Sequence, residues 1–322
     1  DRIVTSSPKN VKRVAKALVN RGVAKGMRQD IQGAIEDYTA VIEMPDAPVD
    51  HVAQALVNRG ITKGRQQDFA GAIEDYTAVI ELPDAPVDQV AKALVNRGVT
   101  KGSQQDIQGE IEDYTAVIEL PDAPVDQVAK ALVNRGVTKG RQQDFAGAIE
   151  DYTAVVELSD APVDQVAKAL FNRGQQRNKK GETDASLADW IRVLGLSGAP
   201  SEACVEAANA ILHCVIAHPN QKDDDDVTAA LNTWLTQLDI KERSARLVEL
   251  LAALAEPEGE KVWIYAVRRL VQDWAKAPEE FAVFTLVADI LDTEDTTKLD
   301  PLPPEQRDFA LEVMRKFESP EA

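Results

Sequence analysis

One unit recurs along the chain with a period of 38 residues, and this repetition constrains the fold more than any other feature. The pentapeptide Val-Ala-Lys-Ala-Leu, written once as Val-Ala-Gln-Ala-Leu, begins at Val14, Val52, Val90, Val128 and Val166. Five copies of the unit therefore fill residues 1–200. The copies that start at Val52 and Val128 differ at only four of 38 positions. Self-similarity at a fixed period of this length indicates a solenoid, in which stacked copies share a continuous core.

Each unit reads as two helices joined by a short polar turn, and the third copy illustrates the pattern. Pro86 suits the first turn of a helix, where its missing N–H costs little. The polar run after Gly102 ends this helix, and Asp106 is a suitable N-cap for a second one. The second helix carries apolar residues at spacings of three and four, and Pro121 ends it. No useful length alternates with period two, so the sequence predicts an all-α fold.

The repeated columns resemble the tetratricopeptide repeat (TPR) over residues 10–200. The small residue that the family places in its first helix matches Gly22, Gly60, Gly98, Gly136 and Gly174. The family's aromatic residue matches Tyr38, Tyr76, Tyr114, Tyr152 and Trp190. Its second small residue matches Ala34, Ala72 and Ala148, whereas the third copy carries Glu110. The resemblance implies a right-handed α-solenoid of TPR-like helix-turn-helix repeats.

The sequence departs from the TPR pattern in three ways. The period is 38 residues rather than about 34, and the extra residues fall in the Asp-Ala-Pro-Val-Asp connection before each first helix. Arg97 and its equivalents stand where the family buries an apolar side chain, and Lys101 and most of its equivalents stand at a usual aromatic position. A buried guanidinium needs a carboxylate, so we expect Arg97 to pair with Asp113. Ligand contact by the arginines is the alternative.

The resemblance implies that first helices line the concave face of the superhelix and that second helices mostly line the convex face. First helices carry Lys92, Arg97 and Lys101. Second helices carry Glu110, Glu112, Asp113 and Glu119. This distribution predicts a basic inner groove and an acidic outer surface. A basic groove suits a partner with an acidic or carboxylate-ending peptide segment.

Asparagines in one column of the first helices are the sharpest candidates for ligand contact. By the TPR register these amides face the groove, and each offers a donor and an acceptor to an extended peptide backbone. The alternative is that each amide bonds locally to the neighbouring repeat. Lysines of the same helices are further candidates, with solvated surface as their alternative. The predicted peptide-binding residues are Asn20, Asn58, Asn96, Asn134, Asn172, Lys92, Lys130, Lys168, Lys101 and Lys139.

Beyond residue 200 the repeat columns fade, while helical patterns continue over about 201–218, 226–238, 242–255, 259–276, 278–292 and 304–318. We expect residues 201–322 to form a helical region that caps the array or makes a contact of its own. Cys204 and Cys214 are about 15 Å apart along a predicted helix, too far to share a metal ion or a disulfide. Cys214 and His218 share a helix face, but no third group that would orient such a nucleophile pair can be named. The sequence predicts no metal site and no cofactor.

The chain carries 54 acidic and 36 basic side chains, for a net charge of −18. Residues 1–200 account for −5 of this charge and residues 201–322 for −13. The negative total disfavours nucleic acid as the main partner. No apolar run is long enough to span a membrane, and the N-terminal Asp-Arg-Ile-Val leads us to expect no signal peptide. The chain begins at Asp1 without Met, which suggests a piece of a longer protein.

No phosphate-binding glycine loop, Gly-x-Ser-x-Gly motif or His-Glu-x-x-His motif occurs in the sequence. We therefore expect a cytoplasmic, non-enzymatic scaffold that binds a peptide or protein segment in its concave groove, as part of a larger protein or complex. The alternative is a structural spacer or self-assembly array, in which the acidic C-terminal helical region makes the partner contact.

Overall fold

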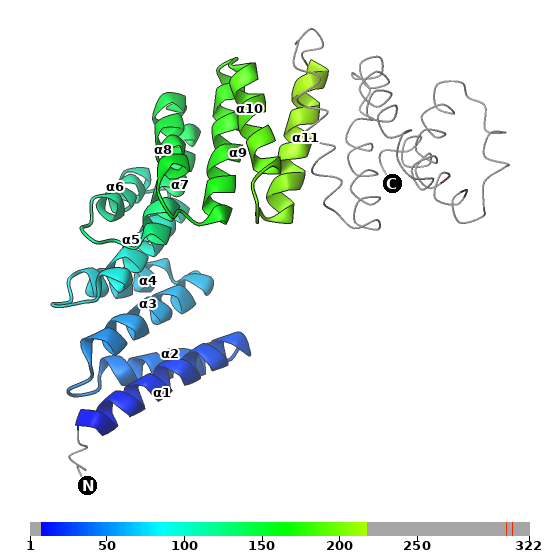
Figure 1. Cartoon of the computed structure of the whole chain (residues 1–322). Coiled ribbons are helices and arrows are strands. Elements are labelled where there is room, and N and C mark those ends of the chain that lie inside the picture. The colour runs from blue at the N-terminus through cyan, green and yellow to red at the C-terminus, as the bar shows by residue number, and fades with distance from the viewer. Residues whose placement is uncertain (1–7, 218–306, 308–310, 312–322) are drawn as a thin grey trace, which may run out of the picture. The chain divides into compact units, whose positions relative to one another are not determined.

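The structure is a computed structural model that describes residues 8–217 together with Arg307 and Leu311. The described part of the chain contains eleven helices and no strand, which confirms the all-α prediction there (Figure 1). Four predicted helices, over 226–238, 242–255, 259–276 and 278–292, lie outside the described residues. So does the helix predicted over 304–318, apart from Arg307 and Leu311.

Every repeat consists of two helices, as predicted, and the first helix is longer than the second. The first helices are α1 (Pro8–Met27), α3 (Val49–Arg65), α5 (Val87–Ser103), α7 (Val125–Arg141) and α9 (Val163–Lys179). The second helices are α2 (Ile31–Ile42), α4 (Phe69–Ile80), α6 (Ile107–Ile118), α8 (Phe145–Glu157) and α10 (Thr183–Leu194). A further helix, α11 (Ser201–Ala217), occupies the position predicted at 201–218.

The turn inside each of the first four repeats is built from a glutamine and an aspartate, whereas the fifth has Gly181 and Glu182 there. In the third repeat Gln105 adopts a left-handed backbone with φ of 66°, which reverses the chain after α5. The carboxylate of Asp106 then accepts a hydrogen bond from the N–H of Gly109 over 3.0 Å, so the predicted N-cap of α6 is confirmed. The same cap recurs at Asp30, Asp68 and Asp144.

The connection between repeats absorbs the residues that lengthen the period. Asp122 takes a left-handed backbone with φ of 58°, and Pro124 follows as the N-cap of α7. Pro86 likewise caps α5 from outside, because the helix begins at Val87; its predicted place in the first turn was wrong by one residue. The last two residues of the Asp-Ala-Pro-Val-Asp connection therefore join the first helix, which is 17 residues long in α5.

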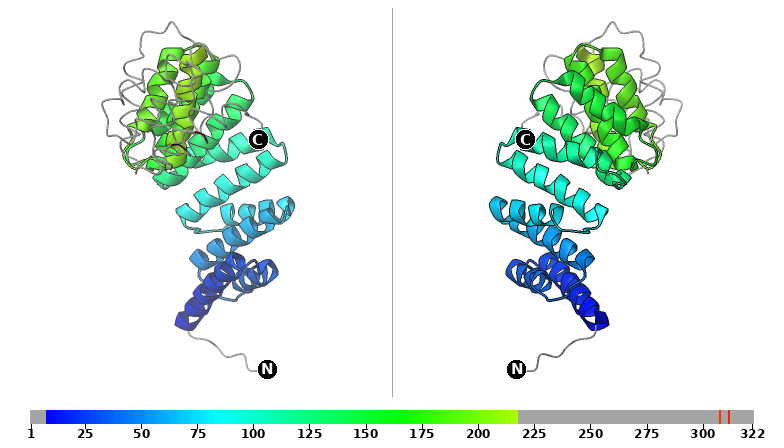
Figure 2. Two further views of the ribbon diagram at one scale, coloured as in Figure 1. Left: turned by 90° about the vertical axis from the view of Figure 1, so that its right-hand side faces the viewer. Right: turned by 90° about the vertical axis from the view of Figure 1, so that its left-hand side faces the viewer.

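The chain divides into two compact units, residues 1–169 and 170–322. In the first unit α1, α3, α5 and α7 each pack against the second helix of their own repeat, and successive members of this series pack against one another. The second helices α2, α4 and α6 also pack against α3, α5 and α7, respectively (Figures 1 and 2). The helices α1, α3, α5 and α7 thus form a continuous layer, whose outer surface we call the first-helix face. The boundary predicted at residue 200 stays a prediction.

Neighbouring repeats share their apolar cores. The third repeat buries Leu94, Val95, Tyr114 and Val117 in one cluster, and Ala131 of α7 completes it from the fourth repeat. A Cβ placed on Gly98 would lie only 2.8 Å from Cε1 of Tyr114, so the glycine and aromatic columns meet directly. A single repeat cannot close this core alone, which is the property that makes a stacked array stable.

Candidate functional site

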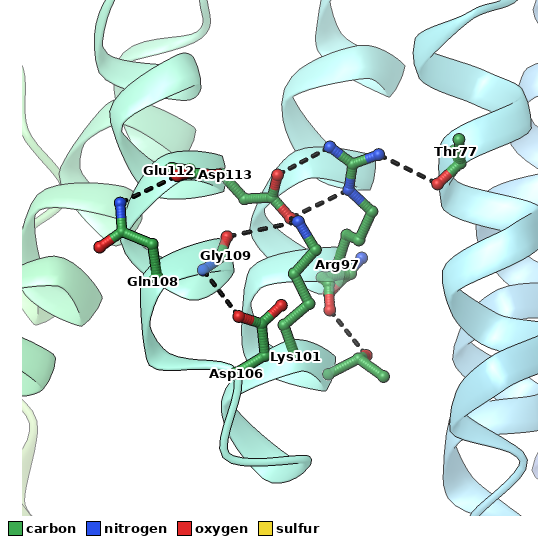
Figure 3. Close-up of polar contacts among 10 residues, drawn as sticks. Thr77, Arg97, Lys101, Asp106, Gln108, Gly109, Glu112 and Asp113 are labelled. Carbon is green, nitrogen blue, oxygen red and sulfur yellow. Dashed lines mark hydrogen bonds and ion pairs between the residues drawn. The ribbon is translucent and has the colours of Figure 1, made fainter.

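An arginine and an aspartate form an ion pair inside each repeat. In the third repeat Nε of Arg97 donates to Oδ2 of Asp113 over 2.9 Å, and Nη2 donates to Oδ1 over 2.7 Å (Figure 3). Asp113 is only 3% exposed, so the planar fork of the guanidinium meets a buried carboxylate. The predicted Arg–Asp pair is confirmed, and it recurs as Arg21–Asp37, Arg59–Asp75, Arg135–Asp151 and Arg173–Asp189.

The same arginine also links its repeat to the preceding one. Nη1 of Arg97 donates to Oγ1 of Thr77 over 3.0 Å, and Thr77 belongs to α4 of the second repeat (Figure 3). The bond recurs between Arg59 and Thr39 and between Arg135 and Thr115. Sequence reasoning missed this contact, although the threonine repeats with the same 38-residue period as the arginine.

A lysine completes the ion cluster in the first four repeats and Arg177 completes it in the fifth, which bears on the lysines predicted to bind a ligand. Nζ of Lys101 lies 3.0 Å from Oδ2 of Asp113 and donates to the carbonyl oxygen of Gly109 over 3.4 Å (Figure 3). Lys139 makes the corresponding ion pair with Asp151 over 2.9 Å. A ligand carboxylate that approaches either lysine would share it with a buried aspartate.

The lysines nearer the start of the first helices form pairs along their own helix. Lys92 lies 3.2 Å from Asp88, one turn earlier, and both side chains are about half exposed. Lys130 and Asp126 are 3.3 Å apart, and Lys168 and Asp164 are 3.8 Å apart. Exposed pairs of this kind contribute little to stability, so these lysines remain accessible to a ligand.

The predicted asparagines lie on first helices at half-buried or exposed positions. Asn20 is exposed, and Asn58, Asn96, Asn134 and Asn172 are half-buried. Asn134 and Tyr114 of the preceding repeat line the same cleft. Ligand contact and local bonding by Asn134 both stay predictions.

That cleft lies between α5 and α7 and has a volume of 310 Å³. Its floor comes from α6, and its lining residues are Val99, Gly102, Ser103, Glu110, Tyr114, Asn134, Val137 and Arg141. Burial, and then the nearby Glu110 carboxylate, raise the pKa of Tyr114, so its hydroxyl stays a hydrogen-bond donor. The cleft therefore joins an apolar wall to hydroxyl, amide and carboxylate groups.

Two of the acidic residues expected on the outer surface of the second helices lie elsewhere. Glu112 and Glu119 are exposed, as expected. Glu110 and Asp113, however, are buried, with 4% and 3% of their surface exposed. Glu110 points toward the first-helix layer because it occupies the small-residue position of the TPR pattern, and Asp113 turns inward to meet Arg97.

The side chains of Cys204 and Cys214, both on α11, are buried. Burial raises the pKa of both the Cys204 and the Cys214 thiol, which disfavours the nucleophilic thiolate. His213 is exposed, and His218 lies outside the described residues. Within the described part of the chain, no three acidic, His or Cys side chains gather as a metal site would require.

No helix among the described residues is both long and apolar enough to cross a membrane. No protein-family model and no curated protein matches the chain. Solved structures do match it. The apo form of RapI has a TM-score of 0.50 and 10% identity, over 95% of this chain and 99% of its own.

Two further structures are similar to the chain at comparable levels. A tetratricopeptide repeat protein from Parabacteroides merdae has a TM-score of 0.48 and 15% identity, over 86% of this chain and 99% of its own. The C-terminal part of a TPR repeat-containing protein from Cytophaga hutchinsonii has a TM-score of 0.48 and 15% identity, over 90% and 99%. Likeness at such identities concerns the fold alone. The consecutive helix pairs of the described repeats, with their glycine and aromatic columns, have the tetratricopeptide-repeat fold.

Proposed function

We propose that the chain is a non-enzymatic interaction scaffold that binds a peptide or protein segment along the first-helix face. The observation that carries the proposal is the 310 Å³ cleft, which is lined by Asn134 and Val137 of α7 and by Val99 of α5. Val99 is 47% exposed, which is high for a branched apolar side chain in a repeat core. An amide next to apolar walls suits a peptide, since the amide binds the backbone and the walls take a side chain.

The pattern of the cleft recurs along the array. In the first four repeats each asparagine is followed three residues later by an apolar residue on the same side of its helix, at Val23, Ile61, Val99 and Val137, whereas Asn172 is followed by Gln175. The buried charged side chains pair largely with one another, as Arg97 and Lys101 do with Asp113. The asparagines, the apolar residues and the exposed lysines such as Lys92 are therefore the side chains available to a ligand on this face.

A triple substitution tests the proposal. Dodecapeptides selected from a random phage library on the immobilised chain serve as probes. We expect Asn58→Ala, Asn96→Ala and Asn134→Ala together to weaken peptide binding at least tenfold, about the loss of one to two good hydrogen bonds. The matched control is Glu74→Ala, Glu112→Ala and Glu150→Ala, at exposed positions of the second helices. Unchanged binding by the asparagine variant, with unchanged circular dichroism, would overturn the proposal.

Deleting one repeat separates the scaffold from a passive spacer. Removal of residues 49–86 takes out one complete 38-residue unit. A spacer tolerates this loss, whereas a peptide that spans several repeats loses its register on the face. Retention of full affinity for every selected peptide would favour the spacer and a contact made elsewhere in the chain.

A further inference from the structure

The third repeat differs from its neighbours at two positions that line the same cleft. At the start of the second helix the first, second and fourth repeats carry alanine, and the third carries Glu110. At the end of the first helix the second and fourth repeats carry Arg65 and Arg141, and the third carries Ser103. Ser103 puts a neutral side chain where the neighbouring repeats have a positive one, and Glu110 puts a negative side chain where they have a neutral one. Both changes make this step of the array more negative than its neighbours.

Glu110 fits because Gly102 leaves space for it. A Cβ on Gly102 would lie 2.6 Å from the carboxyl carbon of Glu110, so a larger residue there would displace the carboxylate from its present position. In the second repeat the corresponding Gly64 faces only the methyl group of Ala72, at 3.9 Å. The carboxylate of the third repeat therefore fills the floor of the cleft, at a place where the second repeat has a small apolar surface.

The Glu110 carboxylate is only partly hydrogen-bonded. Its Oε1 accepts a hydrogen bond from the Tyr114 hydroxyl over 3.3 Å. Its Oε2 is buried and has no hydrogen-bond partner among the described residues. Arg141, on the lining of the same cleft, is exposed and makes no ion pair with Glu110 within 4.0 Å in this part of the chain. A buried carboxylate oxygen without a partner is costly, so a donor from outside would relieve it.

We propose that this cleft binds the cationic side chain, lysine or arginine, of a peptide held on the first-helix face. The proposal rests on the proposed function and adds the ligand chemistry at one position. The cation donates to Oε2 of Glu110, and its methylene stem packs between Val99 and Val137. Ser103 and Asn134 offer further acceptors at the mouth. The segment that fits the array thus carries a basic residue at the third cleft, alongside any acidic residues that meet the exposed lysines.

Parallel selections test the assignment. A random dodecapeptide phage library is selected on the full wild-type chain and on Glu110→Ala, which restores the alanine of the neighbouring repeats. We expect wild-type selection to enrich Lys or Arg at one aligned position, and selection on Glu110→Ala to enrich peptides without that preference. Enrichment on wild type with no basic preference overturns this inference and leaves the scaffold intact. No enrichment on wild type at all overturns the proposed function, and with it this inference.

A double-mutant cycle, with one change in a selected peptide and one in the protein, gives the quantitative test. By fluorescence anisotropy, replacing the enriched Lys with norleucine should weaken binding to wild type about tenfold and leave binding to Glu110→Ala unchanged. Glu110→Gln keeps the shape of the side chain and should behave like Glu110→Ala. Equal losses on wild type and on both variants would show that the basic residue binds elsewhere. Matching circular dichroism spectra establish that all three proteins are folded.

Discussion

The guanidinium of Arg97 donates to the hydroxyl of Thr77 over 3.0 Å, and this bond crosses the boundary between the second and third repeats. The same guanidinium is already fixed in place by Asp113 within its own repeat. One side chain therefore sets both the internal geometry of a repeat and its position on the preceding repeat. This explains why an arginine stands where an apolar side chain would only fill space.

Thr77→Val should lower the free energy of unfolding by about 1–2 kcal/mol, because valine keeps the shape but removes the acceptor of a charged donor. Urea denaturation followed by circular dichroism measures the change. Thr77→Ser keeps the hydroxyl and serves as the control, with an expected loss well below that of valine. Equal losses for the two variants would assign the effect to packing of the methyl group.

Asp37 in the first repeat makes a pH-dependent contribution to the free energy of unfolding, and Asp37→Asn should remove it. Hydrogen bonds from Arg21 lower the pKa of Asp37 below its ordinary value of 3.8, against the opposing effect of burial. A carboxyl whose pKa is lower in the folded state stabilises the fold above its unfolded pKa and loses this effect as the pH falls through the folded pKa. Wild type should therefore exceed Asp37→Asn in stability above about pH 4, and the difference should shrink below it. Urea titrations at several pH values measure it, and a constant difference would contradict the assignment.

The left-handed glutamines predict stabilising glycine substitutions. Gln67, Gln105 and Gln143 have φ values of 65°, 66° and 64°, a conformation that costs a residue with a Cβ about 1–2 kcal/mol. After the entropic cost of glycine, each change to glycine should raise the unfolding free energy by about 0.5 kcal/mol. Thermal and urea unfolding of the triple variant measure the sum.

The residues immediately before these glutamines provide a control one position away. Gln66, Gln104 and Gln142 have φ values of −85°, −93° and −80°, where a Cβ costs nothing. Glycine at these positions should therefore lower stability by about 0.5–1 kcal/mol each. If both triple variants shift stability in the same direction, the left-handed backbone is not the cause.

Glu110→Ala should raise the free energy of unfolding by about 1 kcal/mol, because it removes a buried carboxylate oxygen that lacks a partner. The neighbouring repeats already combine Gly64 with Ala72 at 3.9 Å, so no large cavity is expected. Glu112→Ala, an exposed position on the same helix, is the control and should change little. A loss of stability in Glu110→Ala would mean that the carboxylate stabilises the fold instead of awaiting a ligand.

Local chemistry in the sequence was sufficient to predict the helices and the Arg–Asp pair. Asp106 and Gly109 form the expected cap because a helix start leaves N–H groups that a nearby carboxylate can accept. Arg97 and Asp113 could be paired because an arginine at an apolar position requires a buried anion within the same helix pair. Both predictions depend on chemistry within one repeat.

The contacts that sequence reasoning missed depend on how repeats stack. Thr77 meets Arg97 only after α4 and α5 pack together, which the pattern within one repeat does not specify. Glu110 departs from the small-residue column, and the prediction that it lies on the acidic outer surface is wrong because its side chain is buried. Glu110 is buried because Gly102 leaves space for its carboxylate. The sequence of the second helix alone does not show that this space exists.

The threonine–arginine bond also bears on how such an array can change in length. Every junction described in the first unit presents the same threonine on one side and the same arginine on the other, at Thr39–Arg59, Thr77–Arg97 and Thr115–Arg135. Loss or duplication of one internal unit by unequal recombination would bring an equivalent threonine and arginine together at the new junction. The array can therefore become longer or shorter in steps of 38 residues without the evolution of a new interface between repeats. Glu110 distinguishes the third unit from the other three of the first four, which have alanine at this position.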